Sequence, residues 1–171
     1  MDLLGRVFGE FQAVGQGLPT EPTAVPVKTD TFHHDFVIDA QRRWIWTLGT
    51  KRRGRKIDDL LIAFDRKGRI RKEISLMDLL EPQRIIYPAA PGLWNQFYEG
   101  DLIDWGHANS LSFDTTGRRA LVSLRHQDAV IELNVETEQL LWILASEKGW
   151  SKSRQSLLLK PVGDTQLPHR Q

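Results

Sequence analysis

Four side chains near the middle of the sequence have the chemistry to bind a tetrahedral oxyanion. His107 and Asn109 are separated by one residue, and Arg125 and His126 follow further along the chain. Side chains two apart on an extended strand lie on one face, so His107 and Asn109 can point together. Arg125 ends the next expected strand, and a tight turn would bring it beside them, whereas His126 is expected to face the other way. Donors of the His, Asn and Arg types on one rim suit the oxygens of a sulfate or phosphate group.

A second pair of candidate residues, His33 and His34, begins an earlier strand. Adjacent strand residues face opposite sides, so only one of the two is expected to share a site with His107. Each of these residues taken singly is more often a turn or cap residue than a catalyst, and the hypothesis therefore rests on the cluster. We expect no metal and no cofactor, because the histidines lack an organised carboxylate and a recognisable ligand spacing.

Two strand-rich sections resemble each other and must position these residues. The run 33–39 parallels 107–114, and 59–65 parallels 128–134. A repeated unit of four short strands is typical of a propeller blade. We therefore predict an all-β fold, a β-propeller of which this chain holds about two to three blades of four-stranded antiparallel sheet. The predicted strands are 36–39, 44–47, 60–65, 69–75, 110–114, 120–124, 129–134 and 139–144.

Outside the strand-rich sections the sequence indicates connecting and terminal segments. Residues 1–31 form an N-terminal segment, with a short helix within 1–14 followed by a proline-containing connector. The partial propeller spans 32–162, with an irregular insertion at 76–103 and a short helix or strand within 148–161. Residues 163–171 form a polar tail that is expected to be flexible. About 4–8 blades close a ring, so either a missing portion of the same propeller or a second copy, as a homodimer, would have to complete it.

Composition narrows the classes of protein further. The formal net charge is +1, and there is no cysteine, which excludes disulfides, thiolate zinc sites and cysteine nucleophiles. No apolar run approaches the ~20 residues of a membrane-spanning helix, and the N-terminus does not resemble a secretory signal. The basic run 51–56 is expected to be a solvated loop, with an anion or nucleic-acid patch as the alternative. We therefore expect neither nucleic acid nor a membrane as a partner. Ser110 and Ser123 lack the pattern of a nucleophile elbow, so serine hydrolysis has no support.

Several motifs in order carry a resemblance to a known family. They are Asp104-Trp-Gly-His-Ala-Asn-Ser110, Ser123-Leu-Arg-His-Gln127, Trp142-Ile-Leu144 and Lys148-Gly-Trp150. Together they resemble the bacterial arylsulfotransferases, which need no nucleotide donor, and the run 33–35 resembles an earlier motif of that family. The resemblance covers roughly residues 32–161.

The resemblance implies a six-bladed propeller that transfers a sulfuryl group from an aryl sulfate to a phenol by a ping-pong mechanism through a sulfated histidine. By residue match, His107 and Asn109 would be donors to the sulfuryl oxygens and Arg125 a cationic clamp. His33 or His34 would add a contact or assist proton transfer. It also implies a periplasmic location.

The family's nucleophilic histidine belongs to a motif downstream of the segment that residues 160–162 resemble. His169 lies in a run that does not match this motif, and it is expected to be a tail residue. The sequence therefore predicts a truncated form that lacks the nucleophile segment. The alternative is a non-catalytic propeller module that binds a protein or an anionic ligand.

Overall fold

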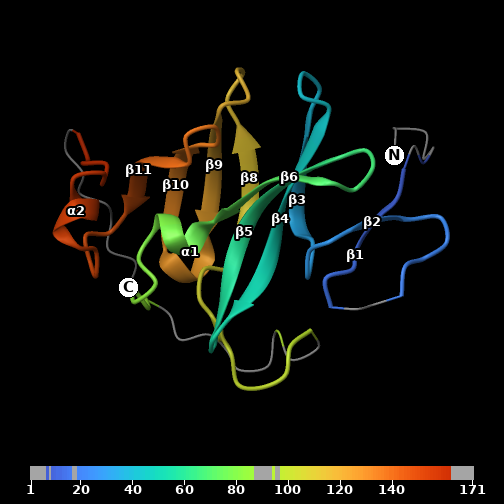
Figure 1. The fold of residues 1–171 in the computed structure, drawn as a ribbon. Helices are drawn as coiled ribbons and strands as arrows, with labels where there is room; N and C mark the ends of the chain where they lie inside the picture. The colour runs from blue at the N-terminus through green and yellow to red at the C-terminus, as the bar shows by residue number, and fades with distance from the viewer. Residues whose placement is uncertain (1–6, 8, 17–18, 87–93, 95–96, 163–171) are drawn as a thin grey trace.

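The computed structural model describes residues 7, 9–16, 19–86, 94 and 97–162, and it consists mainly of two antiparallel sheets (Figure 1). The strands of each sheet follow one another in chain order, with a short additional strand paired to the first sheet. This confirms the predicted all-β fold with blade-like units of four strands. The first sheet contains β3 (His33–Asp39), β4 (Trp44–Arg53), β5 (Lys56–Asp65) and β6 (Ile70–Ser75), and the second contains β8 (Ala108–Phe113), β9 (Arg119–Leu124), β10 (Ala129–Asn134) and β11 (Gln139–Ala145).

Each sheet has the same chemistry at two of its hairpin turns. An Asp or Asn stands at or just after the end of the first and third strands, and its side-chain oxygen accepts a backbone N–H from within the turn. Such a side chain closes the turn without a partner elsewhere in the fold, which explains why these four turns could be located from the sequence. The four acceptors are Asp39, Asp65, Asp114 and Asn134, which bind the amides of Arg42, Lys67, Arg118 and Glu136 respectively.

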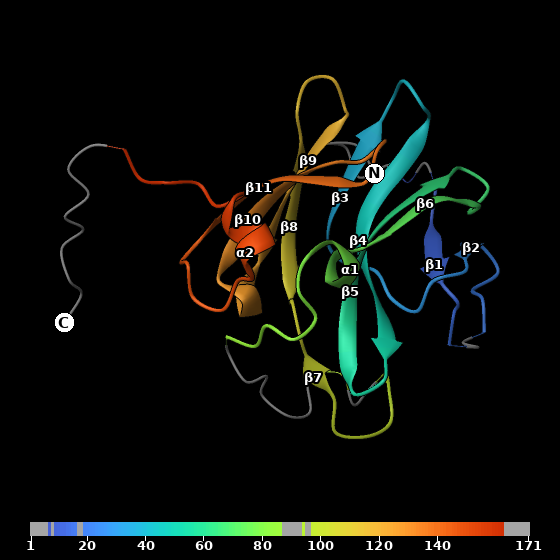
Figure 2. The same cartoon turned by 60° about the vertical axis from the view of Figure 1, so that its left-hand side comes forward.

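The two sheets pack face to face through one hydrophobic core (Figure 2). The first strands of the two sheets, β3 and β8, lie next to each other. Trp46 of β4 is 1% exposed, and its ring lies 5.3 Å from that of Phe113. Val122 and Ile131 of the second sheet are fully buried in the same core. Burial of this shared face is the main force that holds the sheets together.

The N-terminal segment covers part of the outer face of the first sheet. Its strands β1 (Phe11–Ala13) and β2 (Val25–Val27) pair in parallel, and the ring of Phe11 lies 5.0 Å from that of Phe64. The helix predicted within residues 1–14 is wrong at 11–13, where the chain is a strand. Glycines at positions 9 and 15 weaken a helix there, and contact with Phe64 favours the extended form.

A second part of the same outer face remains exposed. Ile38 lies opposite Ile45, which belongs to the cluster beneath β1 and β2. Phe36 and Ile38 are nevertheless 73% and 77% exposed. The apolar face of the first sheet therefore extends beyond the area that the N-terminal strands cover.

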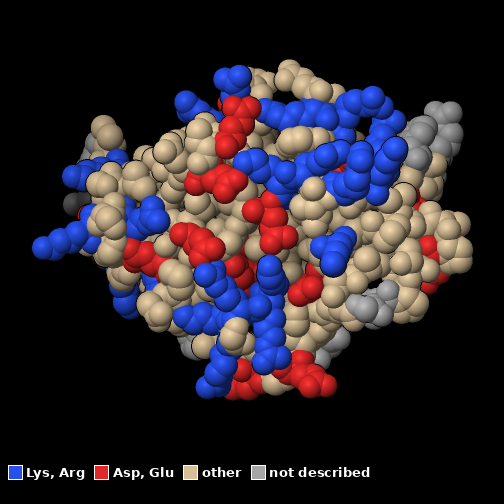
Figure 3. Space-filling model, viewed as in Figure 1, with Lys and Arg blue, Asp and Glu red and all other residues tan. Residues whose placement is uncertain are grey.

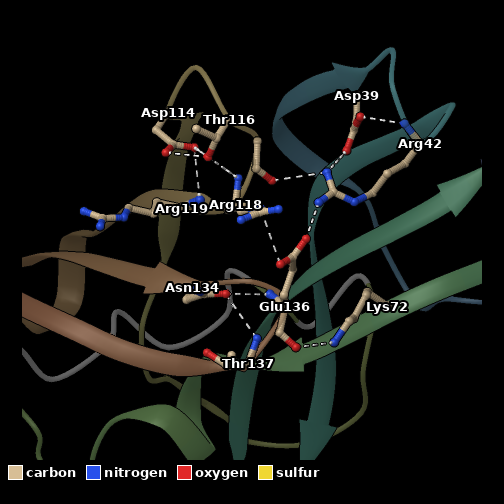
Figure 4. A network of polar contacts seen from close by, with 11 residues as sticks. Asp39, Arg42, Lys72, Asp114, Thr116, Arg118, Arg119, Asn134, Glu136 and Thr137 are labelled. Carbon is tan, nitrogen blue, oxygen red and sulfur yellow. Dashed lines mark hydrogen bonds and ion pairs between the residues drawn. The ribbon is translucent and has the colours of Figure 1, made fainter.

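At the turn end of the fold, polar contacts connect the two sheets (Figure 4). Arg42 forms ion pairs with Asp39 at 2.7 Å and with Glu136 of the second sheet at 2.6 Å. Lys72 of β6 pairs with Glu138 at 2.6 Å. Each exposed pair contributes little alone, but together they fix the turn end of one sheet against the other.

The segment between the two sheets brings a short strand back to the first one. It starts with α1 (Leu76–Leu79) and ends with β7 (Ile103–Asp104), which pairs in parallel with β5 so that Asp104 lies opposite Ile57. The segment 148–161 contains a short helix, α2 (Lys152–Gln155), followed by a single bridge between Leu158 and Ile143. The predicted tail, with His169, lies outside the described residues.

The basic run 51–56 forms the hairpin between β4 and β5. Gly54, with φ of +65°, occupies the turn. Three of the cations form ion pairs: Lys51 with Glu73, Arg53 with Asp78, and Arg55 with Asp101. The other two donate to backbone carbonyl oxygens, Arg52 to that of Glu99 and Lys56 to that of Pro82. Figure 3 shows Lys and Arg side chains interspersed with Asp and Glu on this face. In the described part of the chain, no helix is both long and apolar enough to cross a membrane.

Trp46→Ala is expected to lower the free energy of unfolding by about 3–5 kcal/mol, because it removes a buried ring from the core between the sheets. Phe36→Ala, on the exposed face of the neighbouring strand, should change it by less than about 1 kcal/mol. Urea denaturation followed by circular dichroism measures both. Equal effects of the two substitutions would contradict the assignment of the core to the face that carries Trp46.

Candidate active site

Four imidazole rings form a continuous series at the boundary between the two sheets. The ring centroids of His33 and His34 are 5.3 Å apart, those of His34 and His107 5.8 Å, and those of His107 and His126 4.8 Å. The rings come from β3, from the turn between β7 and β8, and from the 3-10 helix η1 (Arg125–Gln127). His34 and His107, 73 residues apart in the sequence, therefore meet because β3 lies next to β8.

The turn that carries His107 is held in an uncommon backbone conformation. His107 has φ of +51°, in the left-handed region that disfavours most side chains. The amide of Ala108 donates to the buried carboxyl of Asp59 at 3.0 Å, and the His107 carbonyl accepts the Arg125 amide at 3.2 Å. A Cβ at Gly106 would lie 2.4 Å from Asp59 Oδ2, so glycine is required there. Contacts from both sheets therefore fix where the His107 ring projects.

Asp104 binds two of the histidines. Its Oδ2 lies 2.6 Å from His107 Nδ1, and its backbone carbonyl oxygen lies 2.7 Å from His126 Nδ1. The hydrogen bond with Asp104 raises the pKa of His107 above its ordinary value. The adjacent Trp105 is buried in the core between the sheets, so packing explains the presence of this tryptophan. Packing does not explain Asp104, which binds the two histidines.

His126 was placed on the wrong side by the sequence analysis, which assumed a regular strand through Arg125 and His126. The strand β9 ends at Leu124, and Asp128, with φ of +46°, ends the 3-10 helix that follows. This turn directs the His126 ring toward His107. The role of Asp104 was missed as well. Its side chain reaches His107, three residues later, only because the chain turns between β7 and β8.

The two neighbouring histidines of β3 have different environments, although their rings lie 5.3 Å apart. Regular alternation does not apply here, because His34 has φ of +60° and the register against β4 shifts after His33. His34 is exposed and lies beside His107. The Nε2 of His33 is buried 3.8 Å from Asp59 Oδ1, and the ring lies 5.9 Å from that of Trp94. Burial lowers the pKa of His33 to about 4, so this ring is neutral near pH 7.

Asn109 and Arg125 flank the histidines from the second sheet. The register of β8 against β9 shifts between Ala108 and Ser110, so Asn109 occupies a β-bulge and is exposed. The exposed Arg125 starts η1, and its positive charge lowers the pKa of His107, against the dominant effect of Asp104. The structure thus brings His33, His34, His107 and the charge of Arg125 together, while Asn109 is exposed two residues after His107.

Among the described residues, Asp104, His107 and His126 form the group that could hold a metal ion, with ligand atoms within 4.8 Å of one another. The expectation that no carboxylate is organised near the histidines is wrong, because Asp104 contacts two of them. However, the 2.6 Å between Asp104 Oδ2 and His107 Nδ1 is a hydrogen-bond distance, whereas two ligands of a tetrahedral zinc ion lie roughly 3.3 Å apart. The group is therefore arranged for hydrogen bonding. A cleft of about 430 Å³, which Arg53 and Ser75 help to line, includes none of the histidines.

Comparison with known proteins now identifies the family. The family model described as arylsulfotransferase (ASST) matches residues 1–171. The chain belongs to the arylsulfotransferase family. Curated relatives include the arylsulfate sulfotransferase AssT of Escherichia coli O6:H1, 42% identical over 59 residues, and that of Lelliottia amnigena, 37% identical over 59 residues. Each match covers 34% of this chain and 10% of the relative, so the match spans about a tenth of their length. No solved structure matches the chain.

Asp59 and His33 form a buried pair whose titrations oppose each other in this arylsulfotransferase-family chain. Burial raises the pKa of Asp59 from 3.8 to about 7, so its contribution to stability is lost as the pH rises from about 4 to 7. The pKa of His33 is lowered from 6.5 to about 4, so stability is lost as the pH falls through that range. Between about pH 4 and 6.5 the folded protein therefore has a protonated Asp59 and a neutral His33, whereas the unfolded chain has an ionised Asp59 and a protonated His33.

Asp59→Asn, which retains an acceptor for the Ala108 amide, should therefore become more stable relative to the wild type as the pH rises from 4.5 to 7.5. The gain between these two pH values should be about 3 kcal/mol, because the variant has no carboxyl to ionise in the core. Urea denaturation at the two pH values measures it. Asp101→Asn, an exposed control, should give a difference independent of pH. If the difference between Asp59→Asn and the wild type were also independent of pH, Asp59 would ionise as freely in the folded protein as in the unfolded chain.

Proposed function

We propose that this chain provides the aryl-sulfate-binding part of an arylsulfotransferase site. One observation carries the proposal: the rings of His34, His107 and His126 converge at the boundary of two blade-like sheets, near the charge of the exposed Arg125. Asn109 is exposed two residues after His107. Family membership alone would not distinguish a working site from a scaffold. Convergence of these donors from separate elements supports a site for a sulfuryl group.

The charges suit the proposed ligand. An aryl sulfate is an anion whose oxygens accept hydrogen bonds, and charge-assisted bonds from Arg and protonated His are stronger than neutral ones. The raised pKa of His107 favours its imidazolium form, which can donate through Nε2 while Nδ1 remains bonded to Asp104. Arg125 supplies a permanent positive charge, and Asn109 an amide donor.

The proposed reaction has two steps. A histidine nitrogen attacks the sulfur of the donor, an S–N bond forms, and the S–O bond breaks with release of the phenolate, which takes up a proton. A second phenol then loses its proton to a base, and its oxygen attacks the sulfur and releases the histidine. In this proposal His107, Asn109 and Arg125 stabilise the charge on the sulfuryl oxygens. In this proposal the attacking histidine is supplied by another part of the propeller or by a second copy of the chain.

The location and the extent of the unit belong to the same proposal. We place the protein in the periplasm and assign residues 32–162 to the propeller, as the family resemblance implies. The alternative, a non-catalytic propeller module, would use the same exposed donors to bind an anion without turning it over.

Arg125→Ala is expected to weaken binding of 4-nitrophenyl sulfate by about 1.5–3 kcal/mol, the range for a hydrogen bond to a charged group. Isothermal titration calorimetry at low ionic strength measures the affinity. Arg66→Ala is the matched control, since Arg66 is exposed in the turn after β5, at the opposite end of that strand from Asp59. Equal affinities of the two variants would remove Arg125 from the site.

Release of nitrophenol from the same compound, with and without an added phenol, tests turnover. Release that increases with the acceptor and disappears in His107→Ala would establish sulfuryl transfer by this chain and require a nucleophile within it. Binding without release would support the binding part of the proposal and the non-catalytic alternative. Absence of both in the folded protein would reject the proposed function.

A further inference from the structure

We propose that Asp104 is a positioning residue that holds His107 and His126 in one tautomer, so that both rings present Nε2 to the bound sulfuryl group. The inference rests on the proposed function for the identity of the ligand. The state of the two rings follows from the contacts of Asp104 alone and can be measured without any ligand.

The tautomers follow from the kinds of atoms in contact. The carbonyl oxygen of Asp104 can only accept, so His126 Nδ1, at 2.7 Å, must carry the proton of that hydrogen bond. A carboxylate oxygen likewise only accepts, so His107 Nδ1, at 2.6 Å from Oδ2, must also carry a proton. In a neutral imidazole with a protonated Nδ1, the lone pair lies on Nε2. The free lone pairs of both rings are therefore on the side away from Asp104.

The surroundings of Asp104 prevent it from turning away from the histidines. The residue is 2% exposed, and its strand β7 pairs with β5. The amide of His126 donates to the Gly106 carbonyl at 3.0 Å, which ties η1 to the turn between Asp104 and His107. The two rings are 4.8 Å apart with an angle of 36° between their planes. Asp104 and this backbone contact thus hold them as a pair.

The charged and titratable groups around His107 come from four elements. They are Asp104 on β7, Asp59 on β5, His33 and His34 on β3, and Arg125 and His126 on η1. Asp104 and Asp59 favour the protonated ring, whereas Arg125 disfavours it, and the net effect raises the pKa of His107. The hydrogen bond with Asp104 is the largest of these effects, so removal of its charge should lower the pKa of His107.

This arrangement would let one ring serve both steps of the proposed reaction. In the first step His107, as an imidazolium, donates Nε2–H to a sulfuryl oxygen and then gives that proton to the departing phenolate, which leaves the ring neutral. As a neutral ring, the same Nε2 accepts the proton of the incoming phenol when the phenol oxygen attacks sulfur. In both states Nδ1–H stays bonded to Asp104, whose carboxylate stabilises the positive charge that forms on the ring, as in other carboxylate–histidine pairs.

Nitrogen-15 NMR of histidine-labelled protein tests the inference. In the wild type, above the pKa of His107, the His107 and His126 signals should show protonated Nδ1 and unprotonated Nε2, with assignments from His107→Gln and His126→Gln. In Asp104→Asn, the pKa of His107 should fall and part of its population should move to the Nε2–H tautomer. Asp101→Asn, an exposed carboxylate three residues earlier, should leave both signals unchanged.

A neutral wild-type His107 that carries its proton on Nε2 would overturn the inference even if the variant failed to fold. An unchanged His107 titration in a folded Asp104→Asn protein would overturn it as well. A general structural role of Asp104 would not move the tautomer, so the expected result separates positioning from folding.

Ligand binding distinguishes this inference from the proposed function. If both hold, the affinity for 4-nitrophenyl sulfate should fall as the pH rises through the pKa of His107, and Asp104→Asn should weaken binding roughly tenfold at pH 7. The expected tautomers without binding of the aryl sulfate would preserve the role of Asp104 and reject the proposed ligand. Binding of the aryl sulfate by a protein whose neutral His107 has the opposite tautomer would support the proposed ligand and reject the role of Asp104.

Discussion

The buried carboxyl of Asp59 joins the two sheets at the place where the candidate site forms. It belongs to β5 of the first sheet, yet it accepts the amide of Ala108 at the start of the second. Its other oxygen lies against Gly106, where no larger residue fits. A carboxyl group in such a place carries a desolvation penalty, and its pKa of about 7 reflects that penalty. The left-handed conformation of His107 depends on this contact, because the residues on both sides of it are fixed against Asp59.

The segment from Asp104 to Asn109 can be understood residue by residue from these constraints. Asp104 binds the two histidines, Trp105 fills the core between the sheets, and Gly106 leaves room for Asp59. His107 projects from the turn, and Asn109 stands at a bulge on the exposed side. Ala108, fully buried, bonds to Asp59. A short sequence motif thus combines core packing with placement of polar groups, which is why a packing role and a chemical role were both plausible for it.

The exposed apolar residues on the outer faces of the sheets are consistent with blades that pack against further blades. Phe36 and Ile38 lie on the outer face of the first sheet, and Leu144 of the second sheet is 53% exposed. Exposed apolar faces of this kind commonly mark surfaces of association. In contrast, the faces that the two sheets share are fully covered and carry the large side chains of the core.

The sequence by itself determined the elements and the candidate residues. Short runs of β-forming residues predicted most strands, because residue type and pattern act between near neighbours in the chain. His33, His34, His107, Asn109 and Arg125 were likewise evident from residue type and motif. Only the tertiary structure decided how they meet. The direction of His126, the contact of Asp104 with two rings and the burial of His33 against Asp59 depend on a 3-10 turn, a left-handed residue and the seam between two sheets. Those features are set by contacts between residues far apart in the sequence, which no local pattern records.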